Sequence, residues 1–288
     1  MNKKWAYLLI LSFIWGSSFI LIKKSLLGFT PLQLGSLRII VSGTMLFLVG
    51  FGSLKKLTKS NYKWIAISGL LGTFFPAFLF AYAETEIDSA IASILNSIVP
   101  IMTIVFGIVL FKILSSRKQI IGVIIGFIGA VFLITNGASI NPDQNYWYAF
   151  LVVIATLMYA MNINIIKRHL QNVPAMAIAV GNFAVIIIPA FIILLFSGFF
   201  TSEVLQAPEF NISILYIILL SLFGTAIAKV LFNKLVQIST PVFASSVTYI
   251  MPIVSVSWGL MDGESFSIWQ ALSAIVILFG VYLANSKR

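Results

Sequence analysis

The sequence predicts an all-α integral membrane protein with ten transmembrane helices, arranged as two inverted repeats of five helices each. Hydrophobic residues make up 60% of its 288 positions and the mean hydropathy is +1.07, whereas soluble domains are roughly 45–50% apolar. Charged residues fall between long apolar stretches, with basic and acidic residues on opposite sides. The two halves of the chain also resemble each other along their length.

Apolar stretches long enough to cross a bilayer, which takes about 20 residues, follow one another along the whole chain. We expect spans at residues 5–22, 32–53, 63–83, 89–111, 118–137, 146–166, 174–197, 213–236, 241–261 and 266–285. The opening Met1–Lys4 is typical of a signal peptide, but no small-residue cleavage site follows the apolar run after it. We therefore interpret that run as the first span.

The distribution of charge predicts how these spans are oriented. Basic residues gather in the connections on the side of the N-terminus, whereas the opposite side has only Lys23 and Lys24. All eight acidic residues fall in the connections on that opposite side. Because cytoplasmic loops are enriched in Lys and Arg, we expect a multi-pass protein with both termini in the cytoplasm.

Composition excludes several kinds of site. With no cysteine and a single histidine, the chain cannot form disulfides, cysteine-based metal sites or multi-histidine sites. We expect no cofactor, no metal and no nucleic-acid partner, because the net charge of +10 lies between spans and not on a polar domain. No nucleophile, acid/base pair or glycine-rich phosphate loop is present, which argues against an enzyme and against ATP-driven transport.

Two cations lie inside predicted spans. Arg38 falls in the second span and Lys229 in the eighth, where Lys229 shares a face with Thr225 and Asn233. A charge inside a membrane is costly and normally faces a cavity or a partner, and no Asp or Glu lies deep in any span. We hypothesise that they bind a carboxylate or phosphate on a substrate. The alternatives are that Lys229 reaches the interface and that Arg38 only braces helices.

The fourth and ninth spans share a polar pattern. In Ser89–Phe111 the polar positions recur at helical spacing and share one face with Pro100. Pro100 cannot bond the carbonyl of Asn96, so a polar side chain and a free carbonyl coincide at mid-span, as a cavity requires. About 152 residues later, Thr248 and Pro252 repeat the pair.

Aromatic and amide side chains supply further candidates. Trp15 and Tyr159 occupy equivalent positions in the two halves and could form two walls of a pocket, although packing is the alternative. Asn162 needs a polar partner in hydrocarbon. The candidate substrate-binding residues are Trp15, Arg38, Asn96, Tyr159, Asn162, Lys229, Asn233, Thr248 and Tyr249, and the candidate helix hinges or kinks are Pro100 and Pro252.

The internal similarity predicts the topology. Gly72–Thr73 corresponds to Gly224–Thr225, and Lys23–Lys24 to Lys167–Arg168. Because each repeat has an odd number of spans, the second repeat must be inverted in the membrane. Inverted repeats are a recurrent transporter design with the substrate site near the midplane between the halves. Proton antiport and uncoupled exchange stay open, since only Glu84 approaches a buried carboxylate.

Four segments have the order and spacing of a known family. They are Phe13–Lys24 (FIWGSSFILIKK), Phe29–Ile39 (FTPLQLGSLRI), Ala92–Pro100, and Gln119-x-x-Gly122 with Gly126 and Gly129. With them the chain resembles the EamA family of the drug/metabolite transporter superfamily, as two tandem domains at residues 5–136 and 147–285. The resemblance implies a central cavity, alternating access, and export of amino acids or related metabolites across the bacterial inner membrane.

Other functions fit the same residues. An organophosphate or nucleotide-sugar exchanger would also use two cations in its pocket. A membrane sensor or scaffold could bind a small molecule without moving it. We expect a small-molecule substrate, a lipid bilayer around the protein, and a monomer or homodimer.

Overall fold

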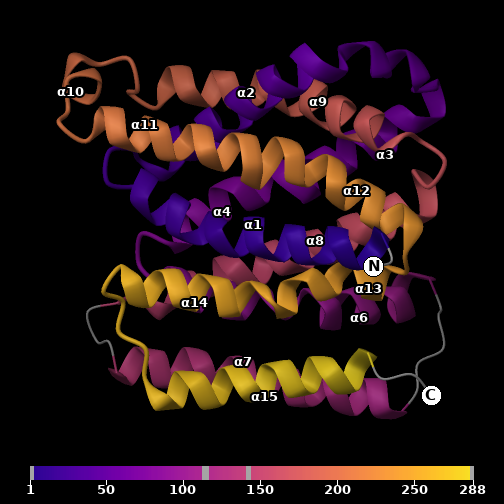
Figure 1. Ribbon diagram of the computed structural model, residues 1–288, viewed down its shortest axis with the longest axis vertical. Coiled ribbons are helices and arrows are strands. Elements are labelled where there is room, and N and C mark those ends of the chain that lie inside the picture. Colours follow the sequence, from indigo (N-terminus) through magenta and orange to yellow (C-terminus); the bar gives the residue numbers. More distant parts are fainter. Residues whose placement is uncertain (1–2, 112–116, 141–143, 286–288) are drawn as a thin grey trace.

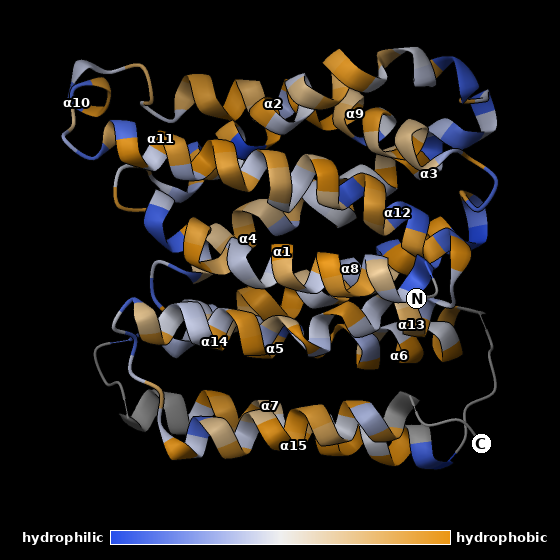
Figure 2. Ribbon diagram, in the orientation of Figure 1, coloured by the Kyte–Doolittle hydropathy of each residue, from blue (hydrophilic) through white to orange (hydrophobic). Residues whose placement is uncertain are grey.

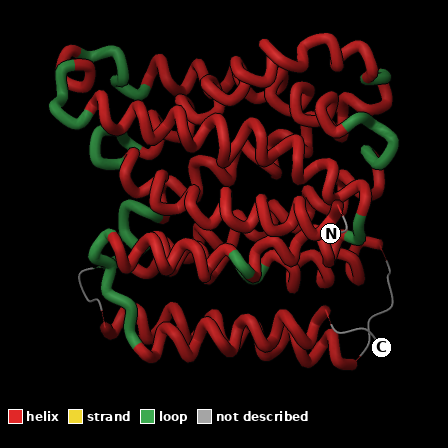
Figure 3. Tube along the Cα trace, in the orientation of Figure 1, coloured by secondary structure: helices red, strands yellow, loops and turns green. Residues whose placement is uncertain are grey.

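The computed structural model describes residues 3–111, 117–140 and 144–285. Every regular element in these ranges is helical (Figure 3). Eight helical stretches are long and apolar enough to cross a membrane, and two shorter apolar helices, Ile120–Thr135 and Ile268–Leu283, accompany them. Hydrophilic residues collect at the helix ends and connections (Figure 2). The all-helical class with membrane-spanning helices is confirmed, whereas ten crossings stay a prediction.

The helical stretches follow one another with short connections. The first half contains α1 (Lys3–Ser25), α2 (Pro31–Gly50), η1 (Phe51–Lys56), α3 (Lys59–Gly69), η2 (Leu70–Phe74), α4 (Phe75–Ala83), α5 (Ser89–Asn96), α6 (Val99–Phe111) and α7 (Arg117–Ile140). The second contains η3 (Tyr146–Tyr148), α8 (Ala149–His169), α9 (Ala175–Phe196), α10 (Ser202–Leu205), α11 (Phe210–Leu219), η4 (Leu220–Ile227), α12 (Ala228–Ile238), α13 (Pro241–Ser245), η5 (Ser246–Tyr249), α14 (Met251–Met261) and α15 (Ile268–Asn285).

Four of the long stretches are interrupted. The π-helical segments η2 and η4 join α3 to α4 and α11 to α12. The helix is broken between α5 and α6, and again at η5 between α13 and α14. Irregular backbone inside a membrane is tolerated where protein surrounds it or where it lines a cavity, and π-helical turns often mark functional sites. These four interruptions therefore indicate where to look for a site.

The helices pack in layers (Figure 1). Contacts pair α2 with α9, α7 with α15, α1 with α14, and α6 with α8. The span Ser89–Leu110 is the most enclosed, since 72% of its most apolar window is buried, against 44–56% for the other candidate spans. It is therefore the centre of the fold. α1 begins and α15 ends on the same side of the molecule (Figure 1).

The pair of α7 and α15 forms a layer of its own (Figure 1). A Cβ added to Gly280 would meet the backbone of α7 at 2.7 Å, at the Gly122 carbonyl and the Gly126 Cα. Small residues let helices approach closely where no hydrophobic effect drives them together. Gly280 is therefore needed for this contact, and the pair packs against the rest of the molecule mainly through α6.

Candidate functional site

A cavity of about 100 Å³ lies where the interrupted stretches meet. Since a water molecule needs about 10–15 Å³ by this measure, the cavity suits several waters or a small organic solute. Seven of the nine candidate binding residues line it, namely Trp15, Arg38, Asn96, Tyr159, Asn162, Lys229 and Thr248. Residues that are far apart in the sequence, from α1 to η5, therefore meet at one place.

The other two candidates are not among the lining residues. Asn233 is fully buried and its amide nitrogen donates a hydrogen bond to the Ala175 carbonyl at 3.3 Å, so it connects α12 to α9. Tyr249 ends η5 and is half-buried outside the lining set. Both are close in sequence to lining residues. Asn233 is one helical turn after Lys229, and Tyr249 directly follows Thr248.

Lys229 is held at the cavity by backbone. It is 6% exposed, in the first turn of α12, and its ammonium donates to the Gly72 carbonyl at 3.0 Å. A Cβ at Gly72 would meet the Lys229 ammonium at 2.8 Å and the Asn162 amide. The space that glycine leaves open in η2 is therefore filled by the ends of these two polar side chains. Lys229 faces the protein interior and does not reach the interface.

Arg38 borders the cavity from α2. Its Nε donates to the Thr225 hydroxyl of η4 at 2.7 Å. One turn on, the Ser42 hydroxyl donates to the Ser221 carbonyl at 3.0 Å. α2 is thus joined to the π-helical segment by side chains at two successive levels, and Arg38 both braces the helices and borders the cavity.

The charge at the cavity is unbalanced. Within the described ranges, neither Arg38 nor Lys229 lies within ion-pair distance of a carboxylate. Their contacts are a hydroxyl and a backbone carbonyl, both neutral. Two cations in a low-dielectric space attract an anion strongly.

Aromatic rings wall the cavity on two sides. The Trp15 indole donates to the Gly224 carbonyl at 2.9 Å and packs edge-on against Phe232, with centroids 4.9 Å apart. Tyr159 stacks on Phe80 at 6.0 Å. Such rings offer apolar surface next to fixed polar groups, as small-molecule sites commonly do.

Amide and hydroxyl groups complete the lining. Asn162 accepts a hydrogen bond from the Ser68 hydroxyl at 2.7 Å. The Asn96 amide oxygen and the Thr73 hydroxyl are buried and have no hydrogen-bond partner among the described residues. Because buried polar groups are normally paired, these two can bind a polar group of a ligand.

The two candidate hinge prolines follow the helix breaks. Pro100 lies in the first turn of α6, after the break at Ser97. Pro252 lies in the first turn of α14, after η5. Proline is tolerated in a first turn because the missing N–H has no helical partner there. The local geometry is compatible with hinging, which stays a prediction.

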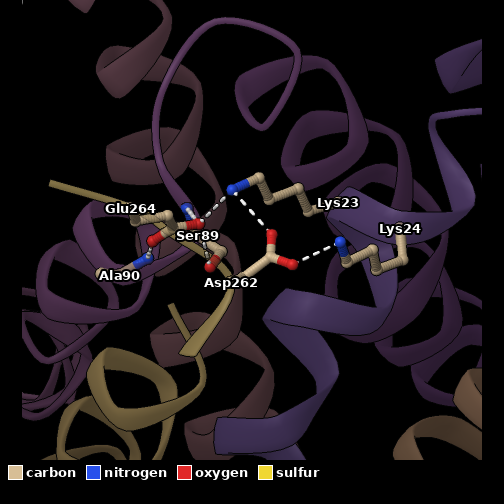
Figure 4. A network of polar contacts seen from close by, with 6 residues as sticks. All are labelled: Lys23, Lys24, Ser89, Ala90, Asp262 and Glu264. Carbon is tan, nitrogen blue, oxygen red and sulfur yellow. Dashed lines mark hydrogen bonds and ion pairs between the residues drawn. The ribbon is translucent and has the colours of Figure 1, made fainter. Parts of the chain in front are cut away.

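A network of charges joins the end of α1, the start of α5 and the connection after α14 (Figure 4). Lys23 at the end of α1 contacts Asp262 at 3.2 Å and Glu264 at 2.8 Å, and Lys24 pairs with Asp262. The Glu264 carboxylate also accepts from the Ser89 hydroxyl at 2.7 Å and from the Ser89 amide at 3.1 Å. We call Lys23, Lys24, Ser89, Asp262 and Glu264 the closing network, and the end that contains it the Lys23 end.

Sequence reasoning placed the four charged residues of the network in connections and Ser89 at the start of the fourth span, and it missed their contacts. Lys23 and Glu264 are 241 positions apart in the sequence. The available signal was that all four charges were expected on one side of the membrane. That oppositely charged connections lie on the same side of the membrane does not determine which of them contact each other.

Comparisons with known proteins agree on a family. The sequence profile of the EamA-like transporter family matches residues 3–135 and 146–286. "Uncharacterized inner membrane transporter YedA" of Escherichia coli (strain K12) is 28% identical over 283 residues, covering 96% of this chain and 89% of the relative. "Probable amino-acid metabolite efflux pump" of Salmonella typhimurium is 25% identical, covering 98% and 95%.

A solved crystal structure has a similar fold. It superposes with a TM-score of 0.62 at 16% identity and covers 95% of this chain and 96% of that chain. An "Uncharacterized transporter" of Archaeoglobus fulgidus is 24% identical over 299 residues, covering 100% and 99%. The similarity therefore extends over 89–99% of the length of these relatives and of the solved structure.

Proposed function

The chain belongs to the EamA-like transporter family, and we propose that it exports a small organic solute with an anionic group, such as an amino acid or a related metabolite, across the inner membrane. The observation that supports this substrate class is the pair of cavity cations, Arg38 and Lys229, without a carboxylate partner in the described ranges. A relative named "Probable amino-acid metabolite efflux pump" agrees with it.

We further propose ten crossings in two inverted repeats, at residues 5–136 and 147–285, which work by alternating access. The interruptions support this arrangement, because η2 and η4 contain the matching pairs Gly72–Thr73 and Gly224–Thr225. Packing supports it as well. α1 packs against α14, and the corresponding helices of the two repeats, α8 and α6, also pack against each other. A cavity between two such halves can open to either side in turn.

The same scheme assigns the sides of the membrane. With basic residues concentrated at the ends where α1 begins and α15 ends, the positive-inside rule favours cytoplasmic termini. The Lys23 end then faces outward. The closing network would shut the cavity from the outside.

The test is counterflow in proteoliposomes loaded with a mixture of unlabelled amino acids, following entry of labelled amino acids. Lys229→Met keeps the length of the side chain and removes its charge, so we expect counterflow of carboxylate solutes to fall at least about tenfold, as for loss of a charged hydrogen bond. Lys234→Met, on the exposed face of the same helix, is the control and should retain counterflow. Equal rates in both variants would contradict the assignment of Lys229.

A phosphorylated solute is the second candidate, because two cations also suit a dianion. The same liposomes loaded with organophosphates distinguish it from the amino-acid class. Binding of labelled solute without counterflow of either class would instead indicate a sensor or scaffold.

A further inference from the structure

Glu84 is a buried carboxylate between the cavity and the closing network. It follows α4 directly, and its amide donates to the Phe80 carbonyl at 2.9 Å, while Phe80 itself lines the cavity. The residue is 6% exposed. Both carboxylate oxygens are buried without a hydrogen-bond donor among the residues that the structure describes. No hydrogen bond in the described ranges therefore accounts for a carboxylate at this buried position.

Charged groups approach Glu84 from several elements. Lys23 of α1, Arg38 of α2 and Glu264 of the connection after α14 act on its charge, and Glu86 and Asp88 belong to its own connection. Lys23 is paired with Asp262 and Glu264, and Arg38 donates to Thr225. The negative charge of Glu264 opposes a second negative charge at Glu84.

An ionised carboxylate in this position is unfavourable. Burial without donors costs much more for a charged group than for a neutral one, and protonation removes that cost. Opening the Lys23 end would bring water to Glu84 and stabilise its ionised form. The closed arrangement therefore binds a proton more tightly than an open one.

We propose that Glu84 takes up a proton when the Lys23 end closes and releases it when that end opens, which makes the closure of that end depend on pH. The step is Glu84–COO⁻ + H⁺ ⇌ Glu84–COOH, with the proton supplied by and returned to solvent on the Lys23 side. This inference rests on the proposed alternating access and adds a proton-dependent gate to it.

Asp262 of the closing network does not supply a pH response near neutrality. Burial raises the pKa of Asp262, but hydrogen bonds from Lys24 and Lys23 outweigh burial and hold that pKa below its ordinary value. Asp262 then stays ionised until the solution is more acidic than the ordinary range of an aspartate. Glu84 differs from it, because the Glu84 carboxylate is buried without a donor in the described ranges.

The absence of cysteine allows a direct test. Ser93 in α5 is fully buried, and its hydroxyl has no partner among the described residues, so Ser93→Cys is a small change. A membrane-impermeant thiol reagent applied from the Lys23 side should label this cysteine only when that end opens. Thr201→Cys is exposed and directly precedes α10, which lies at the same end as the end of α14 (Figure 1), so it corrects for the intrinsic pH dependence of the reagent.

With Glu84 present, we expect corrected labelling to rise several-fold between about pH 6 and about pH 8, and at most about tenfold per pH unit, the limit for one proton. The sign follows from linkage, because lower pH favours the closed form that binds the proton. Glu84→Gln imitates the protonated acid and should give slow labelling that is independent of pH. Glu86→Gln, two residues on and half-buried, should keep the response.

Transport gives a second measurement. Between about pH 6 and about pH 8, Glu84→Gln should keep amino-acid counterflow at the slow rate that the unchanged protein shows at the acidic end of this range, whereas counterflow by the unchanged protein should rise with pH. Labelling that still depends on pH in Glu84→Gln, or that is flat with Glu84 present, would overturn the proton site while leaving alternating access intact. A Ser93→Cys protein that reacts from the Lys23 side at no pH would overturn both proposals.

Discussion

At the scale of residues, Gly72 determines how the cavity is charged. Its missing side chain leaves the space that the Lys229 ammonium and the Asn162 amide occupy, and its carbonyl accepts the Lys229 hydrogen bond. Glycine is required at position 72 because the Lys229 and Asn162 side chains approach it closely. Backbone conformation does not require it, since the residues that flank η2 have helical dihedral angles. One position therefore sets both the place and the partner of the charge.

Gly72→Ala tests this role. The new Cβ would meet the ends of two side chains, which can move, so we expect a change in stability within about 1 kcal/mol but a loss of counterflow of about tenfold or more. Thermal unfolding and proteoliposome counterflow measure the two effects. Gly52→Ala, where a Cβ meets nothing within 4 Å, is the control, and equal counterflow in both variants would contradict the role of Gly72.

At the scale of elements, α7 and α15 stabilise the fold without touching the cavity. Neither helix contributes a lining residue, and their mutual contact depends on the glycine backbone at Gly280. Stability and transport should therefore be separable in this pair.

Gly280→Ala places a Cβ against backbone that cannot yield as a side chain does. We expect a loss of about 1–3 kcal/mol in the free energy of unfolding, seen as a lower Tm, with counterflow per folded molecule unchanged. Ile275→Leu, on the exposed face of α15, should leave Tm unaltered. An unchanged Tm for Gly280→Ala would mean that α7 and α15 can move apart to accommodate the new Cβ without a loss in the free energy of unfolding.

The elements also show what sequence could predict. Long apolar runs determine helices, so the span limits were close: 89–111 was expected and Ser89–Leu110 is found. The π-helical segments were not expected, because one extra residue in a helical turn leaves no hydrophobic signature. The cavity residues could be named in part, since buried polar groups must face something polar. Their individual partners, such as Gly72 for Lys229, depend on tertiary distances.

At the scale of the whole molecule, the closing network connects the beginning of the chain to its end. Glu264 is 8% exposed and joins α1 to the first turn of α5 through Lys23 and Ser89. Charged hydrogen bonds of this kind contribute about 1.5–3 kcal/mol each. If the protein works by the proposed alternating access, the network biases it toward the form in which the Lys23 end is closed.

Glu264→Gln removes the charge and keeps a single acceptor. We expect labelling of Ser93→Cys from the Lys23 side to become about tenfold faster at every pH, because the closed form loses a charged contact. Glu209→Gln, an exposed acid before α11, should change nothing. Slower labelling in Glu264→Gln would mean that Glu264 holds this end open.

The cap of α5 has a consequence for biosynthesis. The first turn of α5 obtains its carboxylate acceptor from a residue 175 positions later, as Ser89 and Glu264 show. At a synthesis rate of about 5–20 residues per second, the ribosome needs on the order of ten seconds or more to cover that distance. Until then the amides of Ser89 and Ala90 must bond water or the insertion machinery, so the final cap of α5 can form only after nearly the entire polypeptide has been made.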